Sequence, residues 1–167
     1  QIQGADVIIN LAGAPILGRW TVKYKKQIVE SRVVTTSALV RAVAMLNKKP
    51  ELFISASAVG VYDTDGENDE YNLRFANNFL ASVCKSWEEA ANPVTQHCRL
   101  AVFRIGVVLA ARNGALKRML PVFQLGLGGT IAGGKQGFPW IHIDDVVKAV
   151  QHAISNTKVS GVYNLVA

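Results

Sequence analysis

The sequence has little cysteine and no long uninterrupted apolar run, and each shortage excludes a class of protein. Two cysteines, Cys84 and Cys98, occur in 167 residues without the paired spacing of a disulfide framework. A reducing compartment, by default the cytoplasm, is therefore expected. The apolar run at residues 100–111 is interrupted by Arg104 and falls short of the roughly 20 residues that a membrane span needs. We therefore expect no membrane partner.

Clustered charge is also scarce, which excludes further partners. The net charge is +6, but the basic residues are scattered and no basic block alternates with aromatic residues, so we expect no nucleic-acid partner. The acidic segment 62–73 has part of the alternation of a calcium loop, but it lacks the closing glutamate and the flanking helices. The glycines of 126–137 lack the Gly-Lys-Ser/Thr ending of a phosphate loop. The sequence predicts a surface loop at 62–73, a glycine-rich connector at 126–137 and no metal site.

Hydrophobic residues make up 50% of the chain, enough for the core of one globular domain. Short buried-strand patterns alternate with amphipathic helical patterns, and Thr21 and Asp144 are the expected helix caps. The expected strands lie within 6–13, 52–55, 100–109 and 161–166, and the expected helices at 21–46, 77–91, 114–125 and 146–155. This alternation predicts an α/β fold with a Rossmann-like, doubly wound parallel sheet. Both ends look cut, so residues 1–167 would be the central part of one domain.

Small and polar residues follow the expected strands, at the place where open α/β sheets bind ligands. Asn10 and Gly13 end the first strand, and small residues at 56–60 end the second. A plain core strand followed by an ordinary glycine turn explains residues 6–13 equally well. Inside the third strand, Gly106 indicates close approach of a ligand or of another backbone, and Arg104 needs an anionic or carbonyl partner.

Several blocks of sequence occur in the order and spacing of one known family. They are residues 7–13 with 19–20, 31–33, 54–62, 84–88, 104–109, 125–129 and 140–145. Over essentially its whole length the chain resembles the extended short-chain dehydrogenase/reductase superfamily, and closely its atypical branch of NAD(P)-dependent epimerase-like proteins, sometimes labelled cell-division-inhibitor-like. The resemblance implies a dinucleotide cofactor, NADP in the first instance with NAD as the alternative, and an unidentified small-molecule substrate. It is also compatible with a homodimer.

The resemblance implies roles for particular residues. The Gly-x-x-Gly-x-x-Gly turn that holds the cofactor's pyrophosphate in the family is absent from this sequence. Ser57 matches the catalytic serine that orients the substrate oxygen. The residues implied to line the cofactor are Leu11, Ala12, Gly13, Ser55, Ala56, Gly106, Val107 and Val108.

The chain departs from the family at the proton relay. In working members a Tyr-x-x-x-Lys pair carries the proton while hydride moves. When the helix is aligned by Trp87, these positions hold Leu80 and Cys84, and a shifted frame places Ala81 opposite Lys85. Neither frame supplies the tyrosine.

Five other residues retain two interpretations each. Tyr62 or Tyr71 could replace the missing tyrosine or be structural, and Tyr62 matches a family tyrosine that is normally structural. His142 fits a buried structural histidine better than a catalytic one. Arg32 could reach the active site or cover the surface. Cys84 lies on an apolar helix face, which favours a packed core thiol over a nucleophile.

Two functions follow from this resemblance. The first is an NAD(P)-dependent epimerase or oxidoreductase that acts on a sugar-nucleotide-like or small carbonyl substrate, with Ser57 polarising the substrate oxygen. The second is a catalytically silent Rossmann module that senses NAD(P) or binds a protein. The missing Tyr-Lys pair favours the second function, whereas Ser57 and the small residues at the strand ends favour the first.

Overall fold

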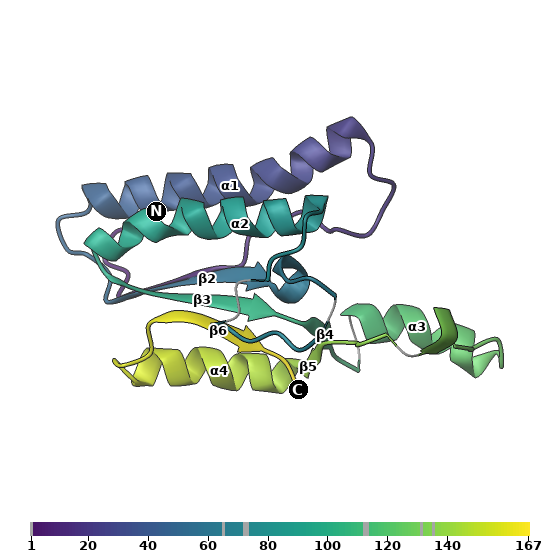
Figure 1. Cartoon of the computed structure of the whole chain (residues 1–167). Coiled ribbons are helices and arrows are strands. Elements are labelled where there is room, and N and C mark those ends of the chain that lie inside the picture. The colour runs from purple at the N-terminus through teal and green to yellow at the C-terminus, as the bar shows by residue number, and fades with distance from the viewer. Residues whose placement is uncertain (1, 65, 72–73, 112–113, 131, 135) are drawn as a thin grey trace.

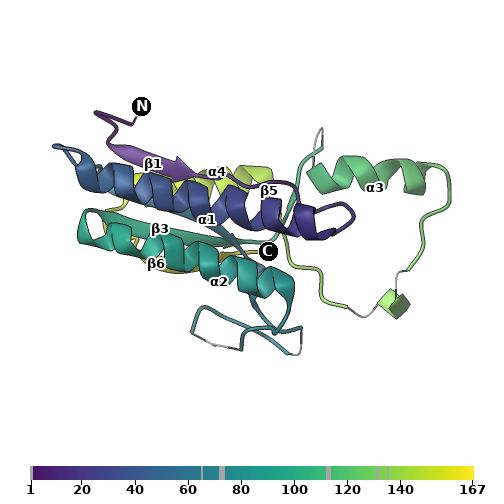
Figure 2. The same cartoon turned by 90° about the horizontal axis from the view of Figure 1, so that it is seen from above.

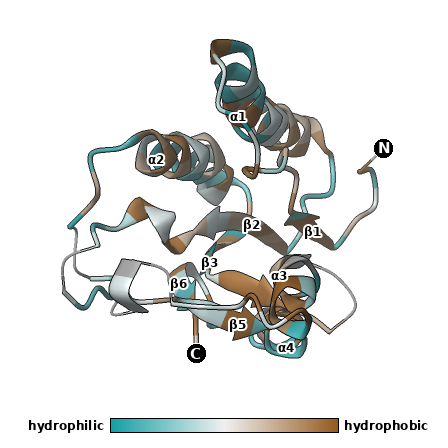
Figure 3. Ribbon diagram, turned by 90° about the vertical axis from the view of Figure 1, so that its right-hand side faces the viewer, coloured by the Kyte–Doolittle hydropathy of each residue, from teal (hydrophilic) through white to brown (hydrophobic). Residues whose placement is uncertain are grey.

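The computed structural model describes residues 2–64, 66–71, 74–111, 114–130, 132–134 and 136–167, and it places a parallel sheet between two layers of helices (Figure 1). The strands, in spatial order, are β1 (Val7–Asn10), β2 (Leu52–Ala58), β3 (Arg99–Ile105) and β6 (Gly161–Leu165). Helices α1 (Val22–Met45) and α2 (Phe79–Ala91) lie on one face, and α4 (Ile143–Ser155) lies on the other (Figure 3). The predicted α/β, Rossmann-like parallel sheet is confirmed.

Polar N-cap side chains fix where helices α1 and α2 begin. The Thr21 hydroxyl accepts a hydrogen bond from the Tyr24 backbone N–H at 3.2 Å, and the Asn78 side chain accepts one from Ala81 at 3.0 Å. Each cap satisfies a backbone donor that has no partner within its helix. The predicted cap at Thr21 is confirmed, and the bounds of both helices agree with the sequence pattern to within two residues.

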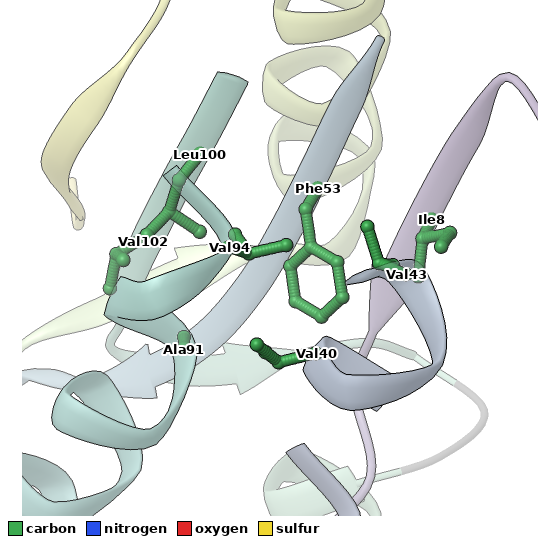
Figure 4. Close-up of a cluster of buried hydrophobic side chains, with 8 residues drawn as sticks. All are labelled: Ile8, Val40, Val43, Phe53, Ala91, Val94, Leu100 and Val102. Carbon is green, nitrogen blue, oxygen red and sulfur yellow. The ribbon is translucent and has the colours of Figure 1, made fainter. Parts of the chain in front are cut away.

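Two apolar clusters hold the layers together, because successive residues of a strand point to opposite faces of the sheet. The fully buried Phe53 lies at the centre of the cluster beneath α1 and α2, which Figure 4 shows. That cluster consists of Ile8, Val40, Val43, Phe53, Ala91, Val94, Leu100 and Val102. The cluster on the α4 side consists of Leu52, Ile54, Ala101, Phe103 and Ala153.

The prediction of one strand over residues 100–109 is wrong, because the chain changes sheets at Gly106. The Gly106 N–H still bonds to Leu165 O of β6 at 3.0 Å, but the next N–H, of Val107, bonds to Pro139 O at 2.8 Å. Residues beyond Gly106 form β4 (Val107–Leu109), which pairs with β5 (Trp140–His142) in a separate two-stranded sheet. The apolar run therefore contains two strands.

The start of α4 also differs from the prediction. The helix begins at Ile143 instead of Val146, and its N-cap is His142, whose Nδ1 accepts from the Asp144 N–H at 3.2 Å. The predicted cap at Asp144 is wrong because the helix has already begun there. His142 is also not the buried histidine expected, since 47% of its side chain is exposed.

The remaining described elements are one helix, two connecting segments and three short 3-10 turns. Helix α3 (Gly114–Gln124) agrees with the prediction and lies away from the sheet, as Figure 2 shows. The predicted loop at 62–73 and connector at 126–137 include residues 65, 72, 73, 131 and 135, which lie outside the described residues. Short 3-10 turns complete the described part: η1 (Val59–Val61), η2 (Asn92–Gln96) and η3 (Ala132–Gly134).

Two further expectations concern membranes and metals. Among the described residues, no helix combines the length and the apolar character that crossing a bilayer requires. The same part of the chain holds no group of three or more histidine, cysteine or acidic side chains arranged to bind a metal ion.

Candidate functional site

The carboxyl ends of β1, β2 and β3 lie along one edge of the sheet. In the strand register Asn10 is opposite Ser55, and Ser57 is opposite Arg104. Partners in register on one face are close neighbours. Both Ser57 and Arg104 reach Glu88 of α2, so a hydroxyl, a carboxylate and a guanidinium group meet under that helix.

Glu88 binds Ser57 and Arg104 at the same time. The Ser57 hydroxyl donates to Oε1 of Glu88 at 2.6 Å, while Nε and Nη2 of Arg104 donate to Oε1 and Oε2 at 2.9 and 2.7 Å. Ser57 and Arg104 are each only 4% exposed. The predicted anionic partner of Arg104 is confirmed. Because the Ser57 hydrogen is directed at the carboxylate, the serine offers a ligand its lone pairs.

Arg104 also links Glu88 to a second set of polar groups. Its Nη1 donates to the Tyr62 hydroxyl at 2.8 Å, and that hydroxyl donates to the Asn164 side-chain oxygen at 2.9 Å. The Asn164 backbone N–H in turn donates to Glu70. The hydrogen bonds that Arg104 donates to Glu88 and to Tyr62 raise the pKa of Arg104, so it stays charged. The Tyr62 hydroxyl therefore has a donor and an acceptor inside the protein, as a structural tyrosine would.

Cys84, which the alignment by Trp87 places opposite the family lysine, is buried against Val61 and Tyr62. Burial raises the pKa of its thiol, and the neighbouring Ala58 backbone, Ser57 and Arg32 make smaller opposing contributions. The thiol is therefore neutral at neutral pH. This environment agrees with the packed-core interpretation of Cys84, and it places a neutral group where a working relay has a cation.

At the end of β1, hydrogen bonds fix the following loop and a tryptophan ring. The Thr36 hydroxyl oxygen accepts from Asn10 Nδ2 at 2.7 Å and from Trp87 Nε1 at 3.0 Å, and both contacts are buried. One helical turn earlier, the Ser31 hydroxyl accepts from the Ala14 N–H at 2.9 Å. Both α1 and α2 are thereby tied to the carboxyl end of β1.

Arg32 lies at this same end of β1. Its Cζ is 5.1 Å from the centroid of the Trp87 ring, and its guanidinium faces Gly13. The side chain is partly buried. Of its two interpretations, the structure favours the one in which Arg32 reaches the edge of the sheet where Ser57 lies.

The residues implied to line the cofactor lie along that edge in different environments. Those of the β1 loop are exposed or half-exposed, those of β2 are buried, and those at the β3–β4 junction are partly buried. The three groups are Leu11, Ala12 and Gly13; Ser55 and Ala56; and Gly106, Val107 and Val108. Tyr71 is 90% exposed and has no hydroxyl contact with this set among the described residues.

Sequence reasoning missed three polar residues of the site. Glu88 entered only as part of a family block, and Thr36 and Asn164 were not singled out. One signal for Glu88 was available: it lies four residues after Cys84, so both occupy one face of the helix that covers the sheet. No comparable signal marks Thr36 or Asn164, whose partners are distant in sequence.

Close approach of another backbone explains the glycine at 106. A Cβ at this position would lie 2.9 Å from the Pro139 carbonyl oxygen. We expect Gly106→Ala to lower the free energy of unfolding by about 1–3 kcal/mol, the usual range for overpacking, as measured by urea denaturation. Gly60→Ala is the control, because a Cβ there meets nothing within 4 Å. Equal stability of the two variants would contradict the expectation.

The chain matches a known family and several of its members in sequence. The model of the NAD dependent epimerase/dehydratase family matches residues 1–165. The chloroplastic epimerase family protein SDR39U1 homolog of Arabidopsis thaliana is 41% identical over 98% of the chain and 48% of its own length. Epimerase family protein SSP1921 of Staphylococcus saprophyticus is 38% identical over 100% of the chain and 57% of its own length. The chain therefore spans about half the length of these curated relatives.

Solved structures agree with the sequence match. The crystal structure of human epimerase family protein SDR39U1 with NADPH superposes with a TM-score of 0.90 at 36% identity, over 98% of this chain and 57% of that one. UDP-glucuronic acid 4-epimerase of Bacillus cereus in complex with NAD superposes with a TM-score of 0.84 at 23% identity, over 99% of this chain and 55% of its own, and at that identity the likeness concerns the fold.

Proposed function

The chain belongs to the NAD-dependent epimerase/dehydratase family, and from that membership we propose that it binds NADP(H), with NAD(H) as the alternative, along the carboxyl ends of β1, β2 and β3. We further propose that it acts as an epimerase or oxidoreductase on a sugar-nucleotide-like or small carbonyl substrate. One observation carries the cofactor proposal: the human relative, 36% identical with a TM-score of 0.90, was crystallised with NADPH. The cofactor residues would be those of 11–13, 55–56 and 106–108.

Ser57 is the catalytic residue of this proposal. Its hydroxyl lies at the carboxyl end of β2 and donates to Glu88, so it would receive a hydrogen bond from a substrate hydroxyl through its free lone pair. To polarise a carbonyl it would first have to release Glu88. When bound, the nicotinamide would supply hydride transfer, and the chain's own contribution would be to orient the oxygen of the reacting carbon.

A second function is favoured by the polar contacts themselves. The Ser57 and Tyr62 hydroxyls both donate to partners inside the protein, and neither alignment of α2, with Leu80 and Cys84 or with Ala81 and Lys85, supplies the family's tyrosine. These contacts suit a Rossmann module that holds NAD(P) without hydride transfer and serves as a nucleotide sensor or a protein-binding unit.

Nucleotide titration followed by turnover assays tests both functions. We expect NADPH fluorescence to change on binding, with Ser57→Ala retaining affinity but losing turnover of UDP-sugars or small carbonyls by about 100-fold or more, the usual cost of removing one hydrogen-bonding group at the reacting oxygen. Ser82→Ala, an exposed serine on α2, is the control. If neither NADPH nor NADH binds, both cofactor proposals fail. Binding without turnover in the unsubstituted chain would leave the silent module.

A further inference from the structure

Two arginines lie near the edge of the sheet that holds Ser57, and only one of them has a counter-charge. Arg104 is neutralised by Glu88 at 2.7 Å. Arg32 makes no ion pair with any described residue, and its Nη1 donates a hydrogen bond to Ile28 O of its own helix at 3.1 Å. A partly desolvated guanidinium normally has an anionic partner. The missing partner therefore needs an explanation.

The surroundings of Arg32 do not supply that charge. Desolvation by burial lowers the pKa of Arg32, and the neighbours that act in the opposite direction are Cys84 and Tyr24. Neither is a carboxylate, and burial raises the pKa of the Cys84 thiol, which keeps it neutral. Arg32 consequently carries a positive charge whose cost of burial is not offset by a carboxylate of the described chain.

The guanidinium is nevertheless held in a defined place. It stacks on the Trp87 ring at 5.1 Å, and that ring is itself fixed by its hydrogen bond to Thr36. A planar cation on an aromatic face gains cation–π attraction and loses little further freedom when it binds. Arg32 is thus oriented before any ligand arrives.

The Nε and Nη2 atoms of Arg32 are the pair of donors suited to bidentate binding. A Cβ on Gly13 would lie 2.8 Å from Cζ, 2.9 Å from Nη2 and 3.2 Å from Nε of Arg32, so Gly13 lies against the face of the guanidinium and a side chain there would displace it. Neither donor has a hydrogen-bond partner among the described residues, and Gly13 is exposed. Glycine at position 13 thus leaves room for the guanidinium beside the loop, with Nε and Nη2 still without a partner among the described residues.

We propose that Arg32 binds a phosphate or carboxylate group of a ligand through its Nε–Nη2 fork, beside Gly13. Arginine pairs with such groups through two parallel hydrogen bonds, which a lysine cannot reproduce. The ligand rests on the proposed function: the anionic group would come from the dinucleotide cofactor or from a nucleotide-sugar or sugar-acid substrate. Arg32 would then be a binding residue at the active site, with Trp87 as its platform.

Affinities of charge variants provide the test. NADPH, uridine diphosphate and glucuronate would be titrated by calorimetry into the unsubstituted chain, Arg32→Gln, Arg32→Lys and the control Arg41→Gln, which removes an exposed charge from the same helix. We expect Arg32→Gln to weaken at least one of these ligands about 10-fold or more, because a hydrogen bond to a charged group contributes on that scale. Arg32→Lys should recover part of the loss, and Arg41→Gln should change little.

The pattern of losses identifies the source of the group. Weaker NADPH binding with unchanged uridine diphosphate and glucuronate assigns it to the cofactor, and the reverse assigns it to the substrate. The proposal is overturned if Arg32→Gln affects every ligand no more than Arg41→Gln does. If Arg32→Gln does not fold, Arg32→Lys decides by the same comparison, because it keeps the charge but not the fork.

A spectroscopic measurement separates this proposal from the proposed function. The ¹H–¹⁵N signal of Arg32 Nε, identified by its absence from Arg32→Lys, should move when inorganic pyrophosphate is added. Movement of that signal without any NADPH binding would retain the anion site and reject the cofactor proposal. A signal that stays fixed in the presence of every anion would reject the anion site.

Discussion

Glu88→Ala is expected to lower the free energy of unfolding by about 3–5 kcal/mol, the usual cost of removing one member of a buried ion pair. The substitution removes the acceptor of both Arg104 contacts and of the Ser57 hydroxyl. The Arg104 side chain, 5% exposed, would then hold a charge with no carboxylate partner among the described residues, in contact with the Tyr62 hydroxyl and with the rings of Tyr62 and Phe75. Urea denaturation of the variant measures the loss.

Glu89→Ala is the matched control, because Glu89 is the next residue of α2 and is exposed. We expect it to change stability by no more than about 0.5 kcal/mol, as is usual at a surface position. A double variant, Glu88→Leu with Arg104→Met, should recover much of the loss by removing both charges. Equal stability of Glu88→Ala and Glu89→Ala would show that the ion pair does not hold α2 to the sheet.

Phe53→Ala is expected to have an effect of similar size for a different reason. Phe53 is fully buried and packs between Ile8, Val40 and Val43 in the cluster beneath α1 and α2 (Figure 4). Its removal loses apolar burial and leaves a cavity, which together cost about 3–5 kcal/mol for a buried phenylalanine. The midpoint of urea denaturation should fall accordingly.

Phe138→Ala provides the comparison, since Phe138 is 50% exposed on the segment before β5. Its truncation should cost less than about 1 kcal/mol, because little apolar surface is returned to water. A Phe53→Ala variant as stable as Phe138→Ala would mean that the cluster collapses around the missing ring, and the cavity argument would fail.

The alternation of strands and helices could be predicted because each element shows its own spacing of hydrophobic residues over a short stretch of sequence. The apolar spacing and the cap at Thr21 located α1 to within one residue at each end. Strand periodicity cannot say which sheet a residue joins. The break at Gly106 depends on carbonyl groups of Leu165 and Pro139, which are distant in sequence, so the run 100–109 looked continuous.

The candidate site was predictable in part for the same reason. An arginine inside an apolar strand implies a buried partner, and that inference from Arg104 was correct. The identity of the partner depends on how α2 docks on the sheet, which one sequence does not reveal. The lack of a counter-charge for Arg32 could not be inferred from the sequence, because it depends on which side chains the fold places around the guanidinium.

The contact between Glu88 and Arg104 also selects one alignment of β2 and β3. Along β3, Val102 packs toward α1 and α2, Phe103 packs toward α4, and Arg104 again points toward α2. A slip of one residue would turn Arg104 into the apolar cluster of Leu52, Ile54, Ala101, Phe103 and Ala153. No acid belongs to that cluster, so a misaligned sheet would bury an uncompensated guanidinium. A polar pair at the end of the strands thus penalises pairing errors that the apolar stretch before it, residues 100–103, would tolerate.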